Sequence, residues 1–149
     1  MGDLHYGPLP ALQRPLLDKF YRAHGSPMRA GNQGQPWVAR HGELVAALCL
    51  TPIAQGHWLT GLFVAPSARR QAIASTLVRQ ALGQVDSPVW LFCHPDLLGF
   101  YQRLGFDTAV TLPAELAQRL ARYQRSKPLV ALARAQSSEG SSPGNNTSV

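Results

Sequence analysis

Residues 57–82 constrain the fold of this chain most strongly, because they join a strand pattern to a helix pattern through a short turn. Apolar residues build the strand, and it should end at Pro66, which lacks the N–H that a β-ladder needs. Gly61 interrupts the strand and indicates a bulge or a close approach of the backbone. Beyond the turn, apolar residues recur at helical spacing from Ile73 to Leu82. The stretch therefore predicts a central strand followed directly by a helix.

The start of that helix combines arginines with small side chains, as Ala-Arg-Arg-Gln-Ala-Ile-Ala-Ser over residues 68–75. Free backbone N–H groups and the positive end of the helix dipole point out of such a terminus. Small side chains let an anion approach the main chain. The alternative is an ordinary strand-to-helix turn with solvated arginines. The residues that we expect to cradle a phosphate are Arg69, Arg70, Gln71, Ala72, Ile73, Ala74 and Ser75.

A second stretch, over residues 88–106, contains an apolar run that stops at His94 and ends in Phe-Tyr-Gln-Arg-Leu-Gly-Phe. In order and spacing, the two stretches resemble the GNAT N-acetyltransferase superfamily. The acetyl-CoA-binding motif of that family reads Arg or Gln, two residues, Gly, one residue, then Gly or Ala. Arg69 falls on its first position and Ala74 on its last. Ala72 replaces the usual glycine; we expect it to keep helical dihedrals, although its methyl group could crowd a diphosphate.

The resemblance implies an α/β fold, a twisted mixed sheet of six or seven strands with helices on both faces. It also implies a V-shaped splay between the two central strands, which opens a slot for the cofactor. A chain of 149 residues should form one domain, which we place at residues 1–135. Residues 136–149 are rich in Ser, Gly and Asn without apolar periodicity, so we expect a disordered tail there.

Local patterns predict the other elements, while residues 1–9 show none. Helices are expected from Pro10 or Pro15 to Ala23 and over residues 73–82, 96–104 and 113–123. Strands are expected over residues 36–41, 44–53, 57–64, 89–93, 106–112 and 128–133. The first three strands should form an antiparallel meander. The strand at 89–93 follows a helix and can lie parallel to the central strand.

The resemblance further implies direct transfer of an acetyl group from acetyl-CoA to a primary amine. The pantetheine arm would pair with the central strand at Leu62, Phe63 and Val64. Tyr101 is the expected acid, since a phenol with an ordinary pKa near 10 stays protonated at pH 7 and can protonate the departing thiolate. Half-buried packing is the alternative for Tyr101. His94 stands where many members carry a cofactor-contacting asparagine; its alternatives are a base or a simple strand end.

The general base and the acceptor are less defined by the sequence. The central strand carries no carboxylate, so the candidates for the base are a water chain, His41, Glu43, His57 and Asp96. The loop before the first hairpin lines the acceptor site in the family, although a mobile loop is the alternative reading. The expected contacts to a small-molecule or peptide amine are Met28, Arg29 and Trp37.

Composition limits the remaining function classes. The net charge of +6 is compatible with nucleic-acid binding. However, the arginines are spread along the chain instead of clustered, and a polyanionic cofactor would also need positive potential near its site. A non-catalytic acyl-CoA-binding or regulatory module is the main alternative, and a nucleic-acid-binding protein ranks below it. Cys49 and Cys93 lie in apolar runs, so we expect reduced core residues in a cytoplasmic protein, with no metal site. No apolar run suits a membrane span; a homodimer is left open.

Overall fold

A computed structural model describes residues 3–28, 33–69 and 72–135, which fall into two compact units. Unit 1 comprises Met1–Thr51 and Leu59–Val85, and unit 2 comprises Pro52–Trp58 and Asp86–Val149. The expected single domain over residues 1–135 stays a prediction. The expected disordered tail at 136–149 lies outside the described residues.

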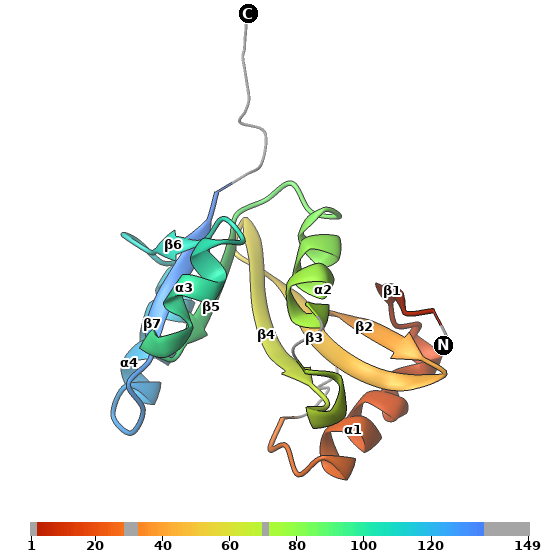
Figure 1. Cartoon of the computed structure of the whole chain (residues 1–149). Coiled ribbons are helices and arrows are strands. Elements are labelled where there is room, and N and C mark those ends of the chain that lie inside the picture. Colours follow the sequence, from red (N-terminus) through yellow and green to blue (C-terminus); the bar gives the residue numbers. More distant parts are fainter. Residues whose placement is uncertain (1–2, 29–32, 70–71, 136–149) are drawn as a thin grey trace, which may run out of the picture. The chain divides into compact units, whose positions relative to one another are not determined.

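Seven strands form one mixed sheet in the order β1-β2-β3-β4-β5-β7-β6 (Figure 1). Strands β4 and β5 pair in parallel through His57↔Val89 and Trp58↔Trp90, as expected for a strand that follows a helix. The mixed α/β fold is therefore confirmed, whereas the V-shaped splay stays a prediction. The strand bounds are β1 His5–Pro8, β2 Gln35–His41, β3 Glu43–Ile53, β4 Gly56–Val64, β5 Val89–Cys93, β6 Asp107–Thr108 and β7 Val130–Arg134.

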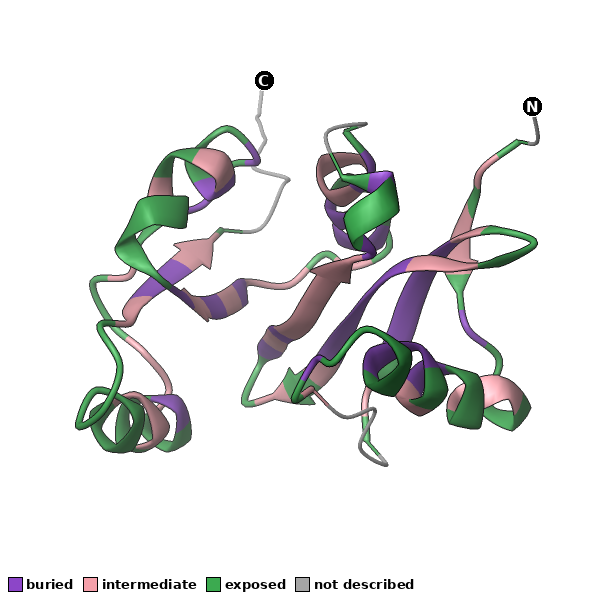
Figure 2. Cartoon of the chain, turned by 60° about the horizontal axis from the view of Figure 1, so that its bottom comes forward, coloured by how far each residue is buried: buried purple, intermediate pink, exposed green. Residues whose placement is uncertain are grey.

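Unit 1 places a helix on each face of its strands (Figure 2). Its buried side chains include Leu17 of α1, Leu48 of β3 and Leu77 of α2, each at 0% exposure. Strand β1 was not expected from the sequence; it is a short, partly exposed edge strand that pairs antiparallel with β2 and has no apolar alternation. The helices of the unit are the 3-10 turn η1 Ala11–Gln13, α1 Arg14–Ala23, the 3-10 turn η2 Pro66–Ala68 and α2 Ile73–Leu82.

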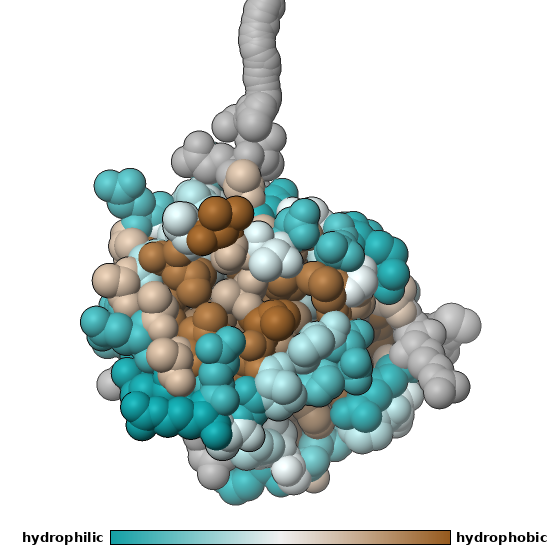
Figure 3. All heavy atoms as spheres, turned by 90° about the vertical axis from the view of Figure 1, so that its left-hand side faces the viewer, coloured by the Kyte–Doolittle hydropathy of each residue, from teal (hydrophilic) through white to brown (hydrophobic). Residues whose placement is uncertain are grey.

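Unit 2 likewise has helices on both faces of β5 and β7 (Figure 2). Apolar side chains also gather at the surface on the side that carries α3, α4 and β6, as Figure 3 shows. The helix expected over 96–104 is a 3-10 turn followed by a short α-helix, which ends at Gln102. The helices of the unit are η3 Pro95–Leu97, α3 Leu98–Gln102 and α4 Ala114–Tyr123.

The strand expected over residues 106–112 is wrong in length. Only Asp107 and Thr108 pair with β7, and one further hydrogen bond joins the Ala109 N–H to the Ala131 carbonyl. Val110 is 97% exposed, so the following residues have no buried face to hold them against the sheet. Strand propensity alone does not extend a ladder that lacks a packed face.

Two negative findings hold for the described part of the chain. No helix there is long and apolar enough to cross a bilayer. No group of three or more His, Cys, Asp or Glu side chains there could hold a metal ion. Cys49 and Cys93 are free and buried, which confirms their expected place in the core.

Candidate functional site

The N-terminus of α2 lies in unit 1 and has the features of an anion site. Among the described residues, no side chain caps the first N–H groups of α2, and its first turn contains no acidic residue. The hydroxyls of Ser75 and Thr76 donate to the Ala72 carbonyl at 3.1 and 2.8 Å, so they close the turn without using those N–H groups. Together with the helix dipole, these groups leave positive potential at the start of the helix.

Ala72 corrects one expectation from the sequence. It precedes the helix as its N-cap, with φ +59° and ψ +18°, rather than taking helical dihedrals. This left-handed conformation costs a residue with a Cβ about 1–2 kcal/mol, whereas glycine adopts it freely. The structure therefore explains physically why the family prefers glycine at this position, and it shows that alanine is accommodated here under strain.

Arg69 is anchored beside this terminus by its own side chain. Its Nε donates to the Val64 carbonyl at 3.0 Å, and its guanidinium carbon lies 5.5 Å from the centre of the Phe63 ring. The terminal nitrogens of the guanidinium are thereby held near the end of β4. Two further expected cofactor residues, Arg70 and Gln71, lie outside the described residues.

Strand β4 contains one residue with a positive φ, Gly61, where φ is +70°. The Tyr21 hydroxyl donates to the Gly61 carbonyl at 2.8 Å, and a Cβ built on Gly61 would lie 2.8 Å from that hydroxyl oxygen. The ring of Phe63 packs against α1, with ring centroids 5.8 Å from Phe20 and 6.4 Å from Tyr21. Helix α1 therefore fixes the part of β4 that contains the expected cofactor residues Leu62, Phe63 and Val64.

Tyr21 was not among the residues predicted from the sequence. The signal present in the sequence was Gly25, which stops α1 just after the tyrosine. Gly25 has φ +68°, and the N–H of Ser26 donates to the Tyr21 carbonyl at 2.9 Å, which closes the end of the helix. Burial raises the pKa of Tyr21. The phenol therefore stays neutral, and can donate a hydrogen bond, at pH values well above the ordinary pKa of tyrosine.

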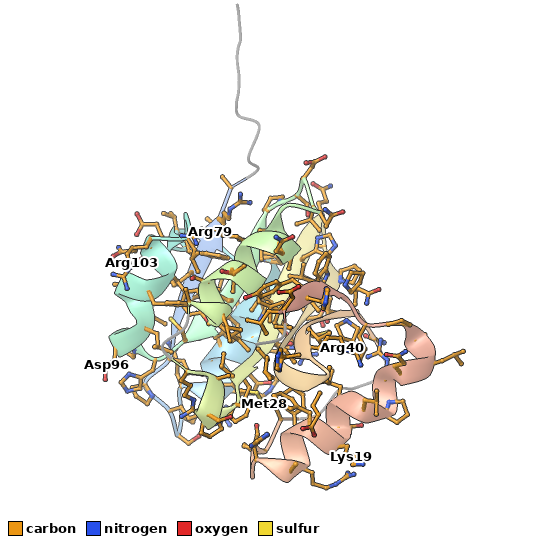
Figure 4. The ribbon with its side chains drawn as sticks, turned by 45° about the vertical axis from the view of Figure 1, so that its right-hand side comes forward. Lys19, Met28, Arg40, Arg79, Asp96 and Arg103 are labelled. Carbon is orange, nitrogen blue, oxygen red and sulfur yellow. The ribbon has the colours of Figure 1, made fainter. Side chains whose placement is uncertain are left out.

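In unit 2, His94 caps the helical segment that carries Tyr101. Its Nδ1 accepts a hydrogen bond from the Asp96 N–H at 3.1 Å, and the same nitrogen lies 3.4 Å from the Asp96 carboxylate. Asp96 itself is 87% exposed and points away from the helix (Figure 4). Because a neutral imidazole has one acceptor nitrogen, accepting at Nδ1 leaves Nε2 as a donor. This arrangement suits a hydrogen-bond contact and disfavours the base role.

Tyr101 is 6% exposed and is held between aromatic neighbours, with ring centroids 4.9 Å from Phe100 and 5.8 Å from Phe106. Gly105, at φ +96°, ends the segment; its N–H and that of Phe106 bond to the carbonyls of Gln102 and Tyr101. Burial, and secondly the nearby Cys93 thiol, raise the pKa of Tyr101. The phenol therefore keeps its proton at neutral pH, as an acid must.

The structure gives less support to the expected acceptor contacts. Trp37 is 8% exposed in the middle of β2, where it pairs with Leu48 and Pro8, which is typical of core packing. The Met28 N–H donates to the Ser26 hydroxyl at 3.2 Å, which extends the turn after α1. Arg29 lies outside the described residues. The acceptor contacts stay predictions.

The candidates for the general base occupy different places. His41 and Glu43 face each other across the turn of the β2–β3 hairpin and are exposed. In unit 2, His57 Nδ1 lies 2.7 Å from the Ser87 hydroxyl. That contact occupies one ring nitrogen, and the other has no hydrogen-bond partner within the part of the chain that the structure describes. The general base therefore stays open.

Comparison with known proteins decides the family. Residues 5–106 match the model of the acetyltransferase (GNAT) family. The chain belongs to the GNAT acetyltransferase family. No curated protein sequence matches the chain. The match covers both the α2 terminus and Tyr101, so every described cofactor and catalytic candidate of this GNAT chain lies inside it.

Solved structures share the fold at low sequence identity. The ribosomal-protein-S18-alanine N-acetyltransferase from Escherichia coli has a TM-score of 0.69 at 14% identity, over 93% of this chain and 97% of that one. Escherichia coli ElaA has a TM-score of 0.63 at 18% identity, over 90% of this chain and 99% of that one. N-acetylglutamate synthase from Neisseria gonorrhoeae, complexed with coenzyme A and L-arginine, has a TM-score of 0.67 at 15% identity, over 93% of this chain and 34% of that one.

Proposed function

We propose that this GNAT chain transfers an acetyl group from acetyl-CoA to a primary amine by direct transfer, without a covalent enzyme intermediate. The observation that carries the proposal is the N-terminus of α2, whose first backbone N–H groups have no side-chain cap among the described residues. This terminus follows Arg69 in the chain and lies within residues 5–106, which match the family model. Two of the similar folds named above support it, since one is an N-acetyltransferase and the other is an N-acetylglutamate synthase complexed with coenzyme A.

The residues present fit the diphosphate of coenzyme A. Ala74 and Ser75 are small, the first turn has no carboxylate among its described residues, and Arg69 supplies a cation. These are the groups that bind phosphate at helix termini. Backbone groups of Leu62 to Val64 would pair with the pantetheine arm, and His94 would donate to it through Nε2. Acetyl-CoA supplies the activated acetyl group.

The proton balance assigns a role to Tyr101. The amine attacks the thioester carbonyl, the C–N bond forms, the C–S bond breaks, and the thiolate leaves. One proton must leave the amine and one must reach the sulfur. A neutral buried phenol is suited to the second step. Main-chain N–H groups of β4 would stabilise the developing oxyanion.

The acceptor amine is expected to have a low enough pKa to be partly neutral at pH 7, or to pass its proton to a chain of water molecules. A lysine amine with a pKa near 10.4 is mostly protonated at pH 7, whereas an α-amine with a pKa near 7.7 to 8 is not. Strand β4 carries no carboxylate to take that proton. The proposal therefore favours an α-amine of a small molecule or peptide over a free lysine side chain.

A thermal-shift series followed by an amine screen tests the proposal. Acetyl-CoA should raise the melting temperature, since ligands that bind only the folded state stabilise it. Released thiol should then report turnover across α-amines, polyamines and lysine peptides. An unchanged melting temperature at saturating acetyl-CoA would overturn the proposal. Binding without turnover on any amine would instead favour a non-catalytic acyl-CoA-binding module. Two features are consistent with that alternative: the strained backbone of Ala72 and the lack of a carboxylate on β4.

A further inference from the structure

The peptide unit between Gly61 and Leu62 has a fixed direction in unit 1. Its carbonyl points toward α1, because it accepts the 2.8 Å hydrogen bond from Tyr21. The described part of the chain contains no cis peptide bond, and a trans unit holds its N–H opposite to its C=O. The N–H of Leu62 is therefore directed away from α1. Helix α2 lies on the face of the unit 1 strands opposite to α1 (Figure 2).

Two features make this direction unusual and well determined. At φ +70°, Gly61 leaves the extended conformation, so its carbonyl reaches a helix instead of following the regular ladder. Tyr21 is 1% exposed and cannot move easily, since its ring packs against Phe63 and the end of α1 is closed behind it at Gly25. No Cβ fits at Gly61 without displacing the Tyr21 hydroxyl.

We propose that Tyr21 is a positioning residue for acetyl transfer: by holding the Gly61 carbonyl, it aims the Leu62 N–H at the thioester carbonyl of bound acetyl-CoA. The inference rests on the proposed function and adds to it a residue from α1 that need not touch substrate. An N–H held in place before the reaction stabilises the developing oxyanion without reorganisation.

The expected effect is larger on turnover than on binding. Removing a fixed oxyanion donor costs about 10²–10³ in kcat. Tyr21→Phe frees the peptide unit without deleting it, so we expect a loss of about tenfold to 100-fold in kcat. The dissociation constant of coenzyme A should change less than about threefold, because the diphosphate contacts at α2 remain.

The matched control is Phe20→Leu. Phe20 belongs to the same aromatic cluster, with its ring 5.8 Å from those of Tyr21 and Phe63, but it makes no hydrogen bond to β4 that the structure shows among the described residues. If Tyr21 serves packing alone, the two variants should lose activity in proportion to their lost stability. If Tyr21 positions the peptide, only Tyr21→Phe should reduce kcat beyond that proportion.

A spectroscopic readout separates positioning from stability. The infrared stretch of bound acetyl-CoA, labelled with carbon-13 at the thioester carbonyl, should shift to lower frequency in the wild type and in Phe20→Leu. It should return toward the solution value in Tyr21→Phe. Equal frequencies in wild type and Tyr21→Phe would overturn the inference while leaving the proposed function intact. Failure of the wild type to bind acetyl-CoA would overturn the proposed function itself and, with it, the inference.

A measurement on the wild type alone covers the case in which Tyr21→Phe does not fold. The amide proton of Leu62, followed by nitrogen-15 NMR, should move downfield with a non-hydrolysable acetyl-CoA analogue and move less with coenzyme A lacking the acetyl group. Equal chemical-shift changes with both ligands would contradict the proposal that the Leu62 N–H is directed at the thioester carbonyl.

Discussion

The hydroxyl of Tyr21 and the carbonyl of Gly61 are 2.8 Å apart, and this hydrogen bond ties the end of α1 to the left-handed turn in β4. Forty positions separate the two residues in the chain. The contact gives the Gly61 carbonyl a hydrogen-bond donor, although the positive φ of Gly61 takes the backbone out of the regular strand conformation. It also places the closed end of α1 against the strand expected to bind the cofactor.

Gly61→Ala should destabilise the chain by about 2 kcal/mol or more. The new Cβ would adopt a left-handed φ and would meet the Tyr21 hydroxyl at 2.8 Å. Chemical denaturation measures the free energy of unfolding. The matched control is Gly7→Ala, another strand glycine of unit 1, where a Cβ meets nothing within 4 Å. Equal effects of the two substitutions would contradict the account of Gly61.

Ala72→Gly should stabilise the fold, unlike most glycine substitutions. Relief of the left-handed φ gains about 1–2 kcal/mol. The added freedom of the unfolded chain costs about 0.4–1 kcal/mol, which leaves a net gain of roughly 0.5–1 kcal/mol. Ala74→Gly, two residues further and inside α2, should instead lose about 0.5–1 kcal/mol. The account is wrong if both variants lose stability to the same extent in urea unfolding.

Tyr101→Phe should lower turnover by about 100-fold or more while leaving coenzyme A affinity nearly unchanged. The ring contacts to Phe100 and Phe106 survive, so the fold should remain. Steady-state kinetics and calorimetric titration together measure the split. Tyr123→Phe, on α4 of the same unit, is the control and should keep full turnover. Unchanged turnover in Tyr101→Phe would remove this residue from the acid role.

His94 should tolerate asparagine and not alanine. Its Nδ1 accepts the Asp96 N–H at the start of the helical segment, a role that an asparagine oxygen can take over. His94→Ala should therefore cost about 1 kcal/mol of stability, and His94→Asn only a few tenths. Thermal melts at pH 8 compare the two variants, and equal losses would show that the cap contributes nothing.

Stability should fall at alkaline pH because of two buried phenols. Burial raises the pKa of Tyr21 and Tyr101 in the folded state, while the unfolded chain titrates near 10. The folded state then keeps protons that the unfolded state loses, so the stabilisation is complete below pH 10 and is lost as pH rises above it. Each phenol should contribute a slope of up to about 1.4 kcal/mol per pH unit. In Tyr101→Phe the decline between pH 9.5 and 11.5 should be shallower than in the wild type; an identical decline contradicts the raised pKa.

The sequence predicted those parts of the fold that depend on local pattern. Helix α2 spans the predicted apolar stripe and ends at Leu82, as that stripe predicts. Its start was expected within residues 68–75 with arginines in the first turn, but it begins at Ile73, and Arg69 is extended before it. The strand at Val89–Cys93 is also found where its apolar run lies. For the same reason the helix terminus proposed to bind phosphate could be located from the amino-acid sequence alone.

The sequence could not predict the contacts that depend on distant partners. Nothing local pairs Tyr21 with Gly61, since their meeting requires α1 and β4 to pack first. The strand predicted after Phe106 is short because propensity does not reveal whether a neighbouring surface covers it. The helical dihedrals expected of Ala72 were wrong because propensity describes a helix interior, whereas the chain changes direction at this residue.

Calorimetric titration of acetyl-CoA into the wild type and into Ala74→Glu tests the central claim most directly. A glutamate in the first turn of α2 interacts favourably with the helix dipole and should leave the fold as stable or more so. The same charge would repel a diphosphate, so the affinity for acetyl-CoA should fall at least about tenfold. The account predicts binding to the wild type and this loss in the variant. Equal affinities, or no heat of binding to the wild type, would contradict it.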